Sequence, residues 1–150
     1  MTIRPYRQDD LPGILSLFHD TVHTACAADY APNQLSAWAP ETPDTAAWEE
    51  KLCREMVLVA EEDGRLLGFG SLDGALLDLL YVHPDCQHRG VGSTLCLFLE
   101  RACPEKVVTV HASRTARPFF EARGYRLLRA QTVVRRGVDL ENFIMELEDV

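Results

Sequence analysis

Three apolar segments in the first half of the chain alternate with short polar turns. They are Met56–Glu61, Leu66–Leu72 and Leu76–Val82. Glu62-Asp63-Gly64 and Asp73-Gly74 separate them, and glycine accepts the positive φ angles that tight hairpin turns require. The pattern predicts three consecutive antiparallel strands.

Helical spacing of apolar positions precedes and follows these strands. A first strand near Thr2–Pro5 is followed by a helix with Asp9 and Asp10 as candidate caps. The apolar face of that helix consists of Leu11, Ile14, Leu15, Phe18 and Val22. Further helices are expected near Thr45–Arg54 and over Val91–Cys103, where Pro104 would end the second one.

The last third predicts a strand, a short helix and a hairpin. The strand is Val107–Ala112, and Thr115 is a candidate cap for a helix that ends at Gly124. Arg126–Val134 and Val138–Leu147 then form the hairpin. No repeat or linker interrupts this order, so we expect one mixed α/β domain over residues 1–150, with helices on both faces of one sheet.

Composition excludes several classes of function. With 47% hydrophobic residues among 150, the chain can bury a core. A net charge of −8 argues against non-specific nucleic-acid binding, which needs a basic face. No apolar run approaches the roughly 18 residues of a membrane span, and no signal peptide is apparent, so we expect a cytoplasmic protein that contacts neither membrane nor nucleic acid.

The cysteine and histidine spacings do not predict a metal site. Five cysteines without Cys-x-x-Cys spacing are typical of reduced thiols in a core. His19 and His23 have helical i, i+4 spacing, but no second ligand pair of suitable spacing lies nearby. We therefore expect no bound metal.

The segment Gln87-His88-Arg89-Gly90-Val91-Gly92-Ser93 follows a strand and begins a helix. Unpaired amides and the positive dipole end at a helix start bind phosphate, and glycine lets the phosphate approach the backbone. The spacing is neither a P-loop nor a dinucleotide fingerprint. It is consistent with a different anion-binding loop, although glycines are also common at helix starts that bind nothing.

This segment resembles motif A of the GCN5-related N-acetyltransferases, Gln/Arg-x-x-Gly-x-Gly/Ala. Ala116–Tyr125 is similar to a second motif of that family, Ala-x-x-Phe-Tyr-Glu-x-x-Gly-Phe. Tyr30, Gln34, Leu35 and the run Ala37–Pro40 match a stretch found in a poorly characterised bacterial branch. The resemblance covers essentially the whole chain.

The resemblance implies a splayed, mostly antiparallel sheet in which the strands ending at Val82 and Ser113 diverge around acetyl-coenzyme A. The Val82 amide would bind the thioester carbonyl. The coenzyme contacts implied are Leu80, Tyr81, Val82, Gln87, His88, Arg89, Gly90, Val91, Gly92, Ser93, Ser113, Arg117 and Phe120.

Two catalytic positions follow from the same resemblance. Asp78 stands where many relatives carry a glutamate, and strand alternation would place it on the side of Leu80 and Val82. It could act as a general base, directly or through water, or equally be a polar residue hydrogen-bonded at the sheet surface. Phe120 occupies the position of the tyrosine that usually protonates the leaving thiolate in this family. A phenylalanine side chain cannot donate a proton. Water could protonate the thiolate instead, or one of the remaining candidate donors Ser113, Tyr30, Tyr125 and His111. Ser113 is also a candidate residue for helix entry.

Acceptor recognition is expected in the N-terminal region. Tyr30, Gln34 and Trp38 would share one face of a helix and could bind an alkylammonium group by cation–π attraction, with His23 and Trp48 as weaker candidates. Core packing is the alternative for Tyr30 and Trp38.

These features predict an acetyl-coenzyme A-dependent N-acetyltransferase that transfers acetyl directly to a small amine, an amino-acid-like compound or a peptide amine. O-acetylation stays open. One alternative is a non-catalytic acyl-coenzyme A sensor or interaction module, favoured by Phe120. Another is a stable fold whose loop binds a different anion, such as sulfate or phosphate. An exposed strand in the final hairpin could support a homodimer.

Overall fold

The computed structural model describes residues 1–148 and contains one seven-stranded sheet with helices on both faces. The elements in chain order are β1 (Thr2–Pro5), η1 (Gln8–Asp10), α1 (Leu11–Ala25), α2 (Pro32–Trp38), α3 (Thr45–Arg54), β2 (Met56–Glu62), β3 (Arg65–Asp73), β4 (Leu76–Val82), η2 (Pro84–Cys86), α4 (Val91–Ala102), β5 (Val107–Ser113), α5 (Arg117–Ala122), β6 (Arg126–Arg135) and β7 (Val138–Glu148). Every element expected from the sequence is present. None of these helices is both long and apolar enough to span a membrane.

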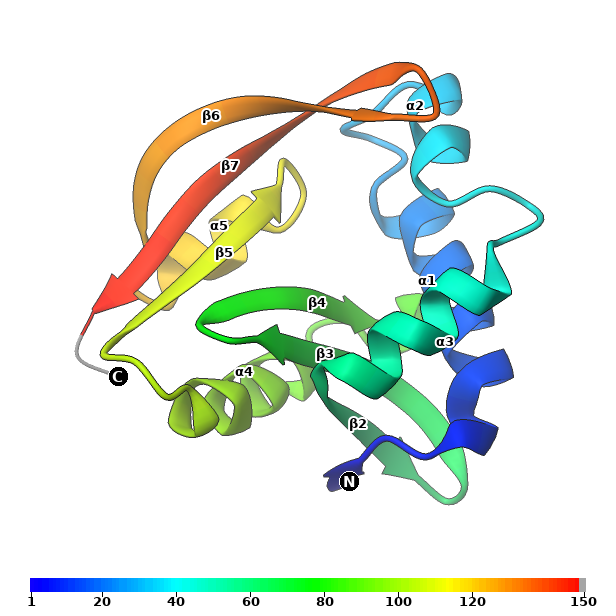
Figure 1. Cartoon of the computed structure of the whole chain (residues 1–150), viewed down its shortest axis with the longest axis vertical. Coiled ribbons are helices and arrows are strands. Elements are labelled where there is room, and N and C mark those ends of the chain that lie inside the picture. The colour runs from blue at the N-terminus through cyan, green and yellow to red at the C-terminus, as the bar shows by residue number, and fades with distance from the viewer. Residues whose placement is uncertain (149–150) are drawn as a thin grey trace.

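The strand order in the sheet is β1-β2-β3-β4-β5-β7-β6. All neighbours are antiparallel except β4 and β5, which are parallel and pair only at Leu76 with Thr109 and at Leu77 with Val110. Beyond that point the two strands separate, as Figure 1 shows between the green and yellow arrows. The expected splayed, mostly antiparallel sheet is confirmed.

Three hairpin turns form where the sequence indicated them. Asp63 and Gly64 join β2 to β3, and Arg136 and Gly137 join β6 to β7. All four residues have positive φ angles between 48° and 76°. Two consecutive positive φ angles are typical of the tight turn that matches the twist of paired strands. Gly74, at φ 61°, turns β3 into β4.

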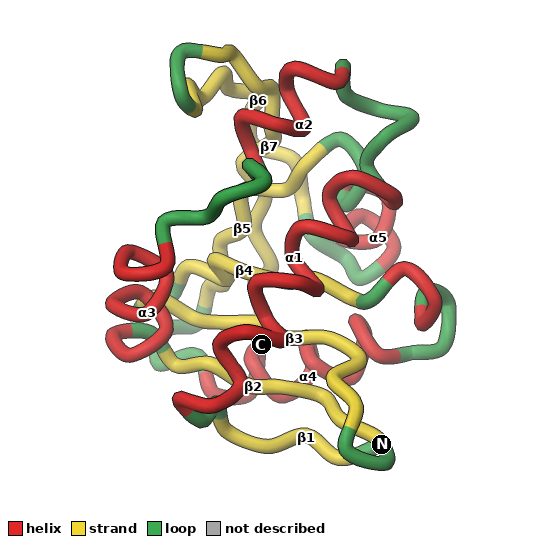
Figure 2. Tube along the Cα trace, turned by 90° about the vertical axis from the view of Figure 1, so that its right-hand side faces the viewer, coloured by secondary structure: helices red, strands yellow, loops and turns green. Residues whose placement is uncertain are grey.

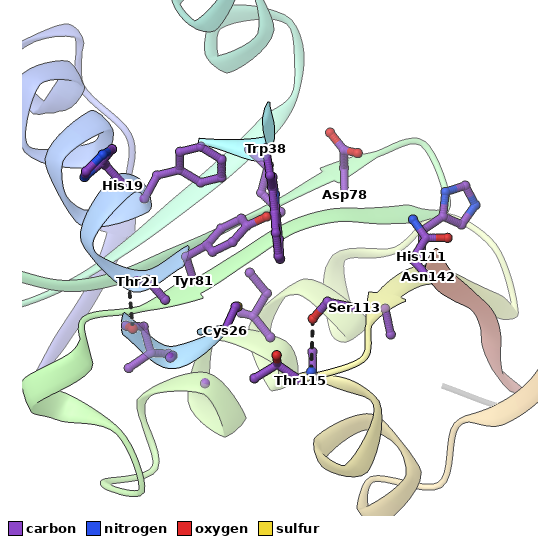
Figure 3. A pocket seen from close by; sticks show the side chains of 18 of the residues that line it. His19, Thr21, Cys26, Trp38, Asp78, Tyr81, His111, Ser113, Thr115 and Asn142 are labelled. Atoms are coloured by element: carbon purple, nitrogen blue, oxygen red, sulfur yellow. Dashed lines mark hydrogen bonds between the residues drawn. The ribbon is translucent and has the colours of Figure 1, made fainter. Parts of the chain in front are cut away.

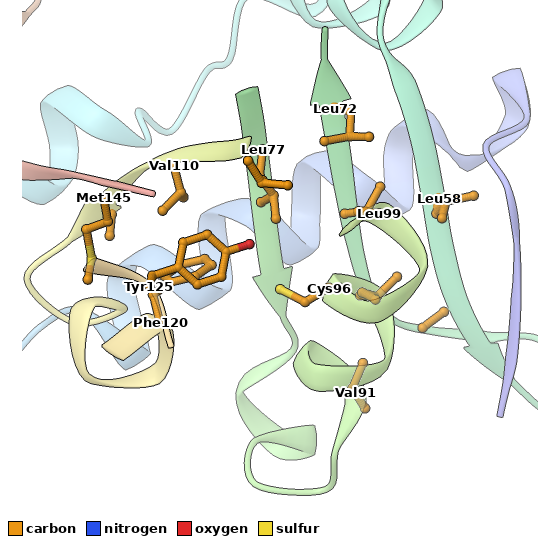
Figure 4. Close-up of a cluster of buried hydrophobic side chains, with 14 of the residues drawn as sticks. Leu58, Leu72, Leu77, Val91, Cys96, Leu99, Val110, Phe120, Tyr125 and Met145 are labelled. Carbon is orange, nitrogen blue, oxygen red and sulfur yellow. The ribbon is translucent and has the colours of Figure 1, made fainter. Parts of the chain in front are cut away.

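Two apolar clusters hold the helices against opposite faces of the sheet. One lies between the sheet and α1, α2 and α3, which pass in front of the strands in Figure 2. The other lies beneath α4 and α5 and includes Leu95, Leu99, Phe120 and Tyr125 (Figure 4). The sheet is therefore the middle layer of three.

A buried polar group stabilises the α4 side of the sheet. Glu100 in α4 is buried and accepts a hydrogen bond of 2.7 Å from the Tyr125 hydroxyl. Arg123 forms an ion pair with the same carboxylate. Burial and the adjacent Glu100 raise the pKa of Tyr125, so its hydroxyl stays protonated. A buried carboxylate needs such partners because its desolvation is costly.

The start of α5 differs from the sequence expectation. Thr115 does not cap this helix, because its hydroxyl donates to Asp29 Oδ2 at 2.7 Å. Ser113 Oγ accepts from the Ala116 N–H at 3.0 Å instead. The helix begins at Arg117, directly after Ala116. Ser113 precedes Ala116 by three residues, and at this spacing its side-chain oxygen can accept the Ala116 N–H. Gly124, at φ 96°, follows the end of the helix as expected.

We expect Tyr125→Phe to lower the free energy of unfolding by about 1–3 kcal/mol, because it leaves the buried Glu100 carboxylate without one donor. Tyr6→Phe is the matched control, since the Tyr6 hydroxyl is buried and has no hydrogen-bond partner within residues 1–148. Urea unfolding of both variants measures the difference. Equal losses would show that the Tyr125 hydroxyl contributes nothing specific.

Candidate active site

A cavity of about 1430 Å³ lies between the separated ends of β4 and β5. It extends from the first turn of α4, past both strands, to a chamber bounded by α1, α3 and the loop that joins α2 to α3. Most of the residues expected to form the site line it. They are Tyr30, Trp38, Asp78, Leu80, Tyr81, Val82, Gln87, His88, Gly90, Val91, Gly92, Ser93, Ser113 and Phe120.

A β-bulge in β4 creates the separation. Ser71 of β3 pairs with Leu79 and Leu72 pairs with Leu77, so Asp78 is an extra residue without a partner. An extra residue bends the strand and disrupts the ladder locally. The strand leaves β5 at this point, directly after its last paired residue, Leu77.

The bulge corrects the expected orientation of Asp78. Leu80 and Val82 pack against the cluster beneath α4, whereas Asp78 contacts Lys51 of α3 on the opposite face. Strict alternation holds only in a regular strand, and the extra residue shifts it by one position. In Figure 3 the Asp78 side chain lies at the edge of the chamber, on the side of Trp38 and Tyr81.

The open edge of β4 presents unpaired backbone groups to the cavity. His83 donates its N–H to Leu67 of β3 at 2.8 Å. Because successive residues of a strand direct their N–H groups to opposite edges, Val82 and Leu80 direct theirs toward the gap. The Val82 carbonyl on this edge accepts from Thr21 Oγ1 and Gln87 Nε2. The Val82 N–H can therefore bind a ligand oxygen.

The loop before α4 adopts a conformation suited to an anion. His88 and Gly90 have φ angles of 61° and 81°, and α4 begins immediately afterwards at Val91. A Cβ on Gly90 would meet no protein atom within 4 Å, so this position faces open space. The first-turn amides of α4 and its positive dipole end could hold phosphate there.

Two arginines expected at the coenzyme lie outside the cavity lining. Arg89 forms an ion pair with Glu62 at 3.2 Å. Arg117 pairs with Glu121 at 3.3 Å, and its guanidinium lies 4.6 Å from the centre of the Phe143 ring. In both cases a nearby carboxylate competes for the guanidinium. The lining at the start of α4 therefore offers an anion backbone amides rather than these two side chains.

The structure separates the residues expected at the acceptor end. Proline starts α2 at Pro32, so Tyr30 precedes this helix and does not share its face with Gln34 and Trp38. Gln34 lies outside the lining, where it accepts from the Ala31 N–H and donates to the Asp139 carbonyl. His23 also lies outside it and contacts the Ala39 carbonyl at 2.7 Å.

Tyr30 links three segments around the cavity. Its hydroxyl donates to the Glu141 carbonyl at 2.7 Å and accepts from the Arg114 N–H at 2.9 Å. Its ring centroid lies 5.4 Å from that of Trp38. Burial raises the pKa of Tyr30, and its single proton is engaged with Glu141. Both aromatic candidates therefore line the cavity and also contribute to packing.

The candidate proton donors differ in availability. Tyr125 donates to Glu100 on the α4 side and does not line the cavity. Phe120 is 2% exposed and packs between Phe119 and Tyr125, and the half-buried Phe119 lines the cavity near Gly92. Ser113 lines the cavity, and its hydroxyl proton has no acceptor in the described part of the chain.

Aromatic residues already named from the sequence line the chamber. Phe18 and Tyr81 make an edge-to-face contact with ring centroids 4.9 Å apart, and the ring centroid of Trp48 lies 4.8 Å from that of Phe18. Lys51, Glu41 and Arg135 add charge to the lining and were not identified from the sequence. Lys51 follows Trp48 at i, i+3 spacing in α3, which places both on one helix face and is the signal that could have indicated Lys51.

Sequence comparison identifies the family. A sequence model described as an acetyltransferase (GNAT) domain matches residues 26–147. The chain is 37% identical over 143 residues to the uncharacterised N-acetyltransferase YafP of Escherichia coli (strain K12). The aligned region covers 95% of this chain and 93% of YafP. The chain belongs to the GNAT family of acetyl-coenzyme A-dependent acyltransferases.

Solved structures agree with this assignment. A GCN5-related N-acetyltransferase from Rhodopseudomonas palustris superposes with a TM-score of 0.95 and is 35% identical, covering 98% of this chain and 94% of the other. The paia N-acetyltransferase from Thermoplasma acidophilum, in complex with coenzyme A, has a TM-score of 0.77 at 20% identity, with 99% of each chain covered. The second likeness concerns the fold alone.

We expect Gly90→Ala to weaken coenzyme A binding at least tenfold, because the new Cβ would occupy the space before the α4 amides. The left-handed backbone also costs about 1–2 kcal/mol of stability with alanine. Gly74→Ala is the control, since Gly74 has φ 61°, faces open space and lies in the β3–β4 turn. Calorimetry and urea unfolding should show similar stability losses, with an affinity loss in Gly90→Ala only.

Proposed function

We propose that this chain, as one domain, transfers acetyl from acetyl-coenzyme A directly to a small amine in the chamber beside Asp78. The observation that carries the proposal is the continuity of one cavity from the α4 amides, along the open edge of β4, to Asp78. A coenzyme held by that loop would direct its thioester along β4. The acceptor would then enter from the side of α1 and α3.

The chamber chemistry supports a cationic or zwitterionic acceptor. Trp38, Trp48 and Tyr81 present aromatic surface, which attracts an ammonium group by about 0.5–2 kcal/mol. Asp78 and Glu41 are lining carboxylates, and Arg135 and Arg136 are lining guanidinium groups. A compound with both an amine and a carboxylate, such as an amino acid, would satisfy both signs of charge.

Contacts across the top of the cavity support a small acceptor. The β6–β7 hairpin reaches over to α2, as Figure 1 shows in orange and red. Arg136 donates to the Ala37 carbonyl at 2.8 Å, and Gln34 donates to the Asp139 carbonyl at 3.0 Å. The Tyr30 bond to Glu141 adds a third connection. These contacts narrow the space available to a folded protein substrate.

The reaction removes two protons from an ammonium acceptor: one before the nitrogen attacks, and a second as the thiolate leaves, which ends on the thiol sulfur. An ammonium group must lose a proton before its nitrogen attacks the thioester carbonyl, since amines of this kind have pKa values near 10.4. In this proposal Asp78 receives that proton, directly or through water. The C–N bond then forms, the C–S bond breaks, and the Val82 N–H stabilises the oxyanion between these steps.

Calorimetric titration of acetyl-coenzyme A, followed by thiol release with a panel of amines, amino acids and lysine peptides, tests the proposal. Micromolar binding and faster release with small amines are expected. Faster release with peptides would overturn the small-acceptor part. Binding without any amine-dependent release would favour a coenzyme sensor, the alternative suggested by Phe120.

We expect Asp78→Asn to lower kcat/KM for the amine by about 10²–10⁴-fold, as loss of a general base does. Acetyl-coenzyme A affinity should be unchanged, because Asp78 lies at the chamber end. Asp73→Asn, at the exposed end of β3, is the control and should retain full activity. Retained activity in Asp78→Asn would remove this residue from the reaction.

A further inference from the structure

Three charged side chains meet at the chamber beside the β4 bulge. Lys51 Nζ lies 3.0 Å from Glu55 Oε2 and forms an ion pair with Asp78 Oδ2. The Asp78 side chain is 22% exposed and that of Lys51 is 32% exposed, and both residues line the cavity. The Glu55 side chain is fully buried behind them.

The two carboxyl groups share one cation. Glu55 Oε1 accepts from Ser71 Oγ at 2.7 Å. Glu55 Oε2 and Asp78 Oδ2 are both buried, and within residues 1–148 neither has a hydrogen-bond partner apart from the Lys51 ammonium. Two ionised carboxylates and one ammonium would leave an uncompensated negative charge, which is costly away from water. One proton on the pair removes that cost.

Burial determines which carboxyl group holds the proton. Burial, with the adjacent Asp78 carboxyl as a further cause, raises the pKa of Glu55. Burial alone would lower the pKa of Lys51, but its hydrogen bonds to Asp78 and Glu55 outweigh that effect and raise it. Asp78 is the member of the pair with access to the cavity. Glu55 is therefore the site at which a proton costs least.

We propose that Lys51 and Glu55 are positioning residues for the acetyl transfer: a proton held on Glu55 and the ammonium of Lys51 maintain Asp78 as a single carboxylate that faces the acceptor. The inference rests on the proposed function of Asp78. The acceptor ammonium transfers one proton to Asp78, Glu55 keeps its own, and the added proton leaves to solvent through the exposed side of Asp78. Lys51 stays charged throughout.

Other charged groups near this cluster are few. Arg54 Nη2 lies 3.6 Å from Glu55 Oε2, but its side chain is 56% exposed, where an ion pair contributes little. Tyr81 from β4, His111 from β5 and Arg135 from β6 line the same cavity. None of them contacts Glu55 in the described part of the chain, and all are unchanged in the variants below.

The first test measures the carboxyl groups directly, without turnover. Carbon-13 NMR of protein labelled at its aspartate and glutamate carboxyls, assigned with Asp78→Asn and Glu55→Gln, should show a protonated Glu55 and an ionised Asp78 at pH 7. In Lys51→Met the two carboxyl groups together should bind more protons at pH 7, because the ammonium that both contact has been removed. An ionised Glu55, or a proton count of the pair unchanged by Lys51→Met, would overturn the proposal.

The second test uses the pH dependence of kcat/KM with one amine. Lys51→Met should move the acidic limb upward, and Lys51→Arg should restore it because the charge is kept. Glu55→Gln should leave the limb in place, since one neutral group replaces another; a downward shift would show that Glu55 is ionised. Lys106→Met, at the exposed residue before β5, is the matched control.

The two tests separate this inference from the proposed function. Absence of transfer by the unaltered protein would refute the proposed function, while the NMR titration would still decide the charge states. If the protein transfers acetyl and its pH profile of kcat/KM is the same in Lys51→Met, the inference is refuted and the proposed function stands.

Discussion

The extra residue at Asp78 is the constraint on which the site depends. It lies directly after the last pair that joins β4 to β5, so the centre of the sheet opens there and both strands present free edges to the cavity. Backbone amides away from water need partners, and a ligand with its own amide and carbonyl groups can supply them. The gap in the sheet therefore offers a ligand backbone groups that the protein does not pair itself. The bulge also turns Asp78 toward α3, whereas Leu80 and Val82 remain packed beneath the sheet.

The opened sheet needs support at its far end. Past Val110 the two halves of the sheet are no longer joined by strand pairing, and contacts through the 29–40 segment connect them instead. The Tyr30 hydroxyl bonds to Glu141, Arg114 Nη1 bonds to the Asp29 carbonyl, and Arg136 bonds to Ala37. These bonds join the N-terminal helices to the final hairpin across the cavity. Aromatic residues that resemble an acceptor-binding face in the sequence therefore also hold the two halves together.

Local sequence patterns predicted the helices and strands, because apolar periodicity and turn glycines depend on residues that are close in sequence. The motif from Gln87 to Ser93 indicated an anion-binding loop for the same reason. Features that depend on contacts between distant segments could not be predicted from the sequence in this way. The face of Asp78 depends on strand register, and one extra residue reverses it. The contact of Lys51 and Glu55 with Asp78 joins residues more than 20 positions apart. The expected helical face of Tyr30 and Gln34 was also wrong. Their i, i+4 spacing is helical, but the helix starts at Pro32, and the side-chain oxygen of Gln34 accepts the Ala31 N–H at its start.

Because Phe120 cannot donate a proton, the departing thiolate must take its proton from another group. The structure limits which groups of the protein can supply it. Tyr125 and Tyr30 each donate their single hydroxyl proton to another group of the protein, so neither offers it to the cavity. Ser113 accepts from the Ala116 N–H, which orients its oxygen and leaves its proton for a ligand. A thiol has a pKa near 8.5, so its thiolate is a fair leaving group at neutral pH without a strong acid nearby. In the proposed reaction the step that needs a base is therefore deprotonation of the acceptor amine, at the end of the cavity where Asp78, Lys51 and Glu55 lie together.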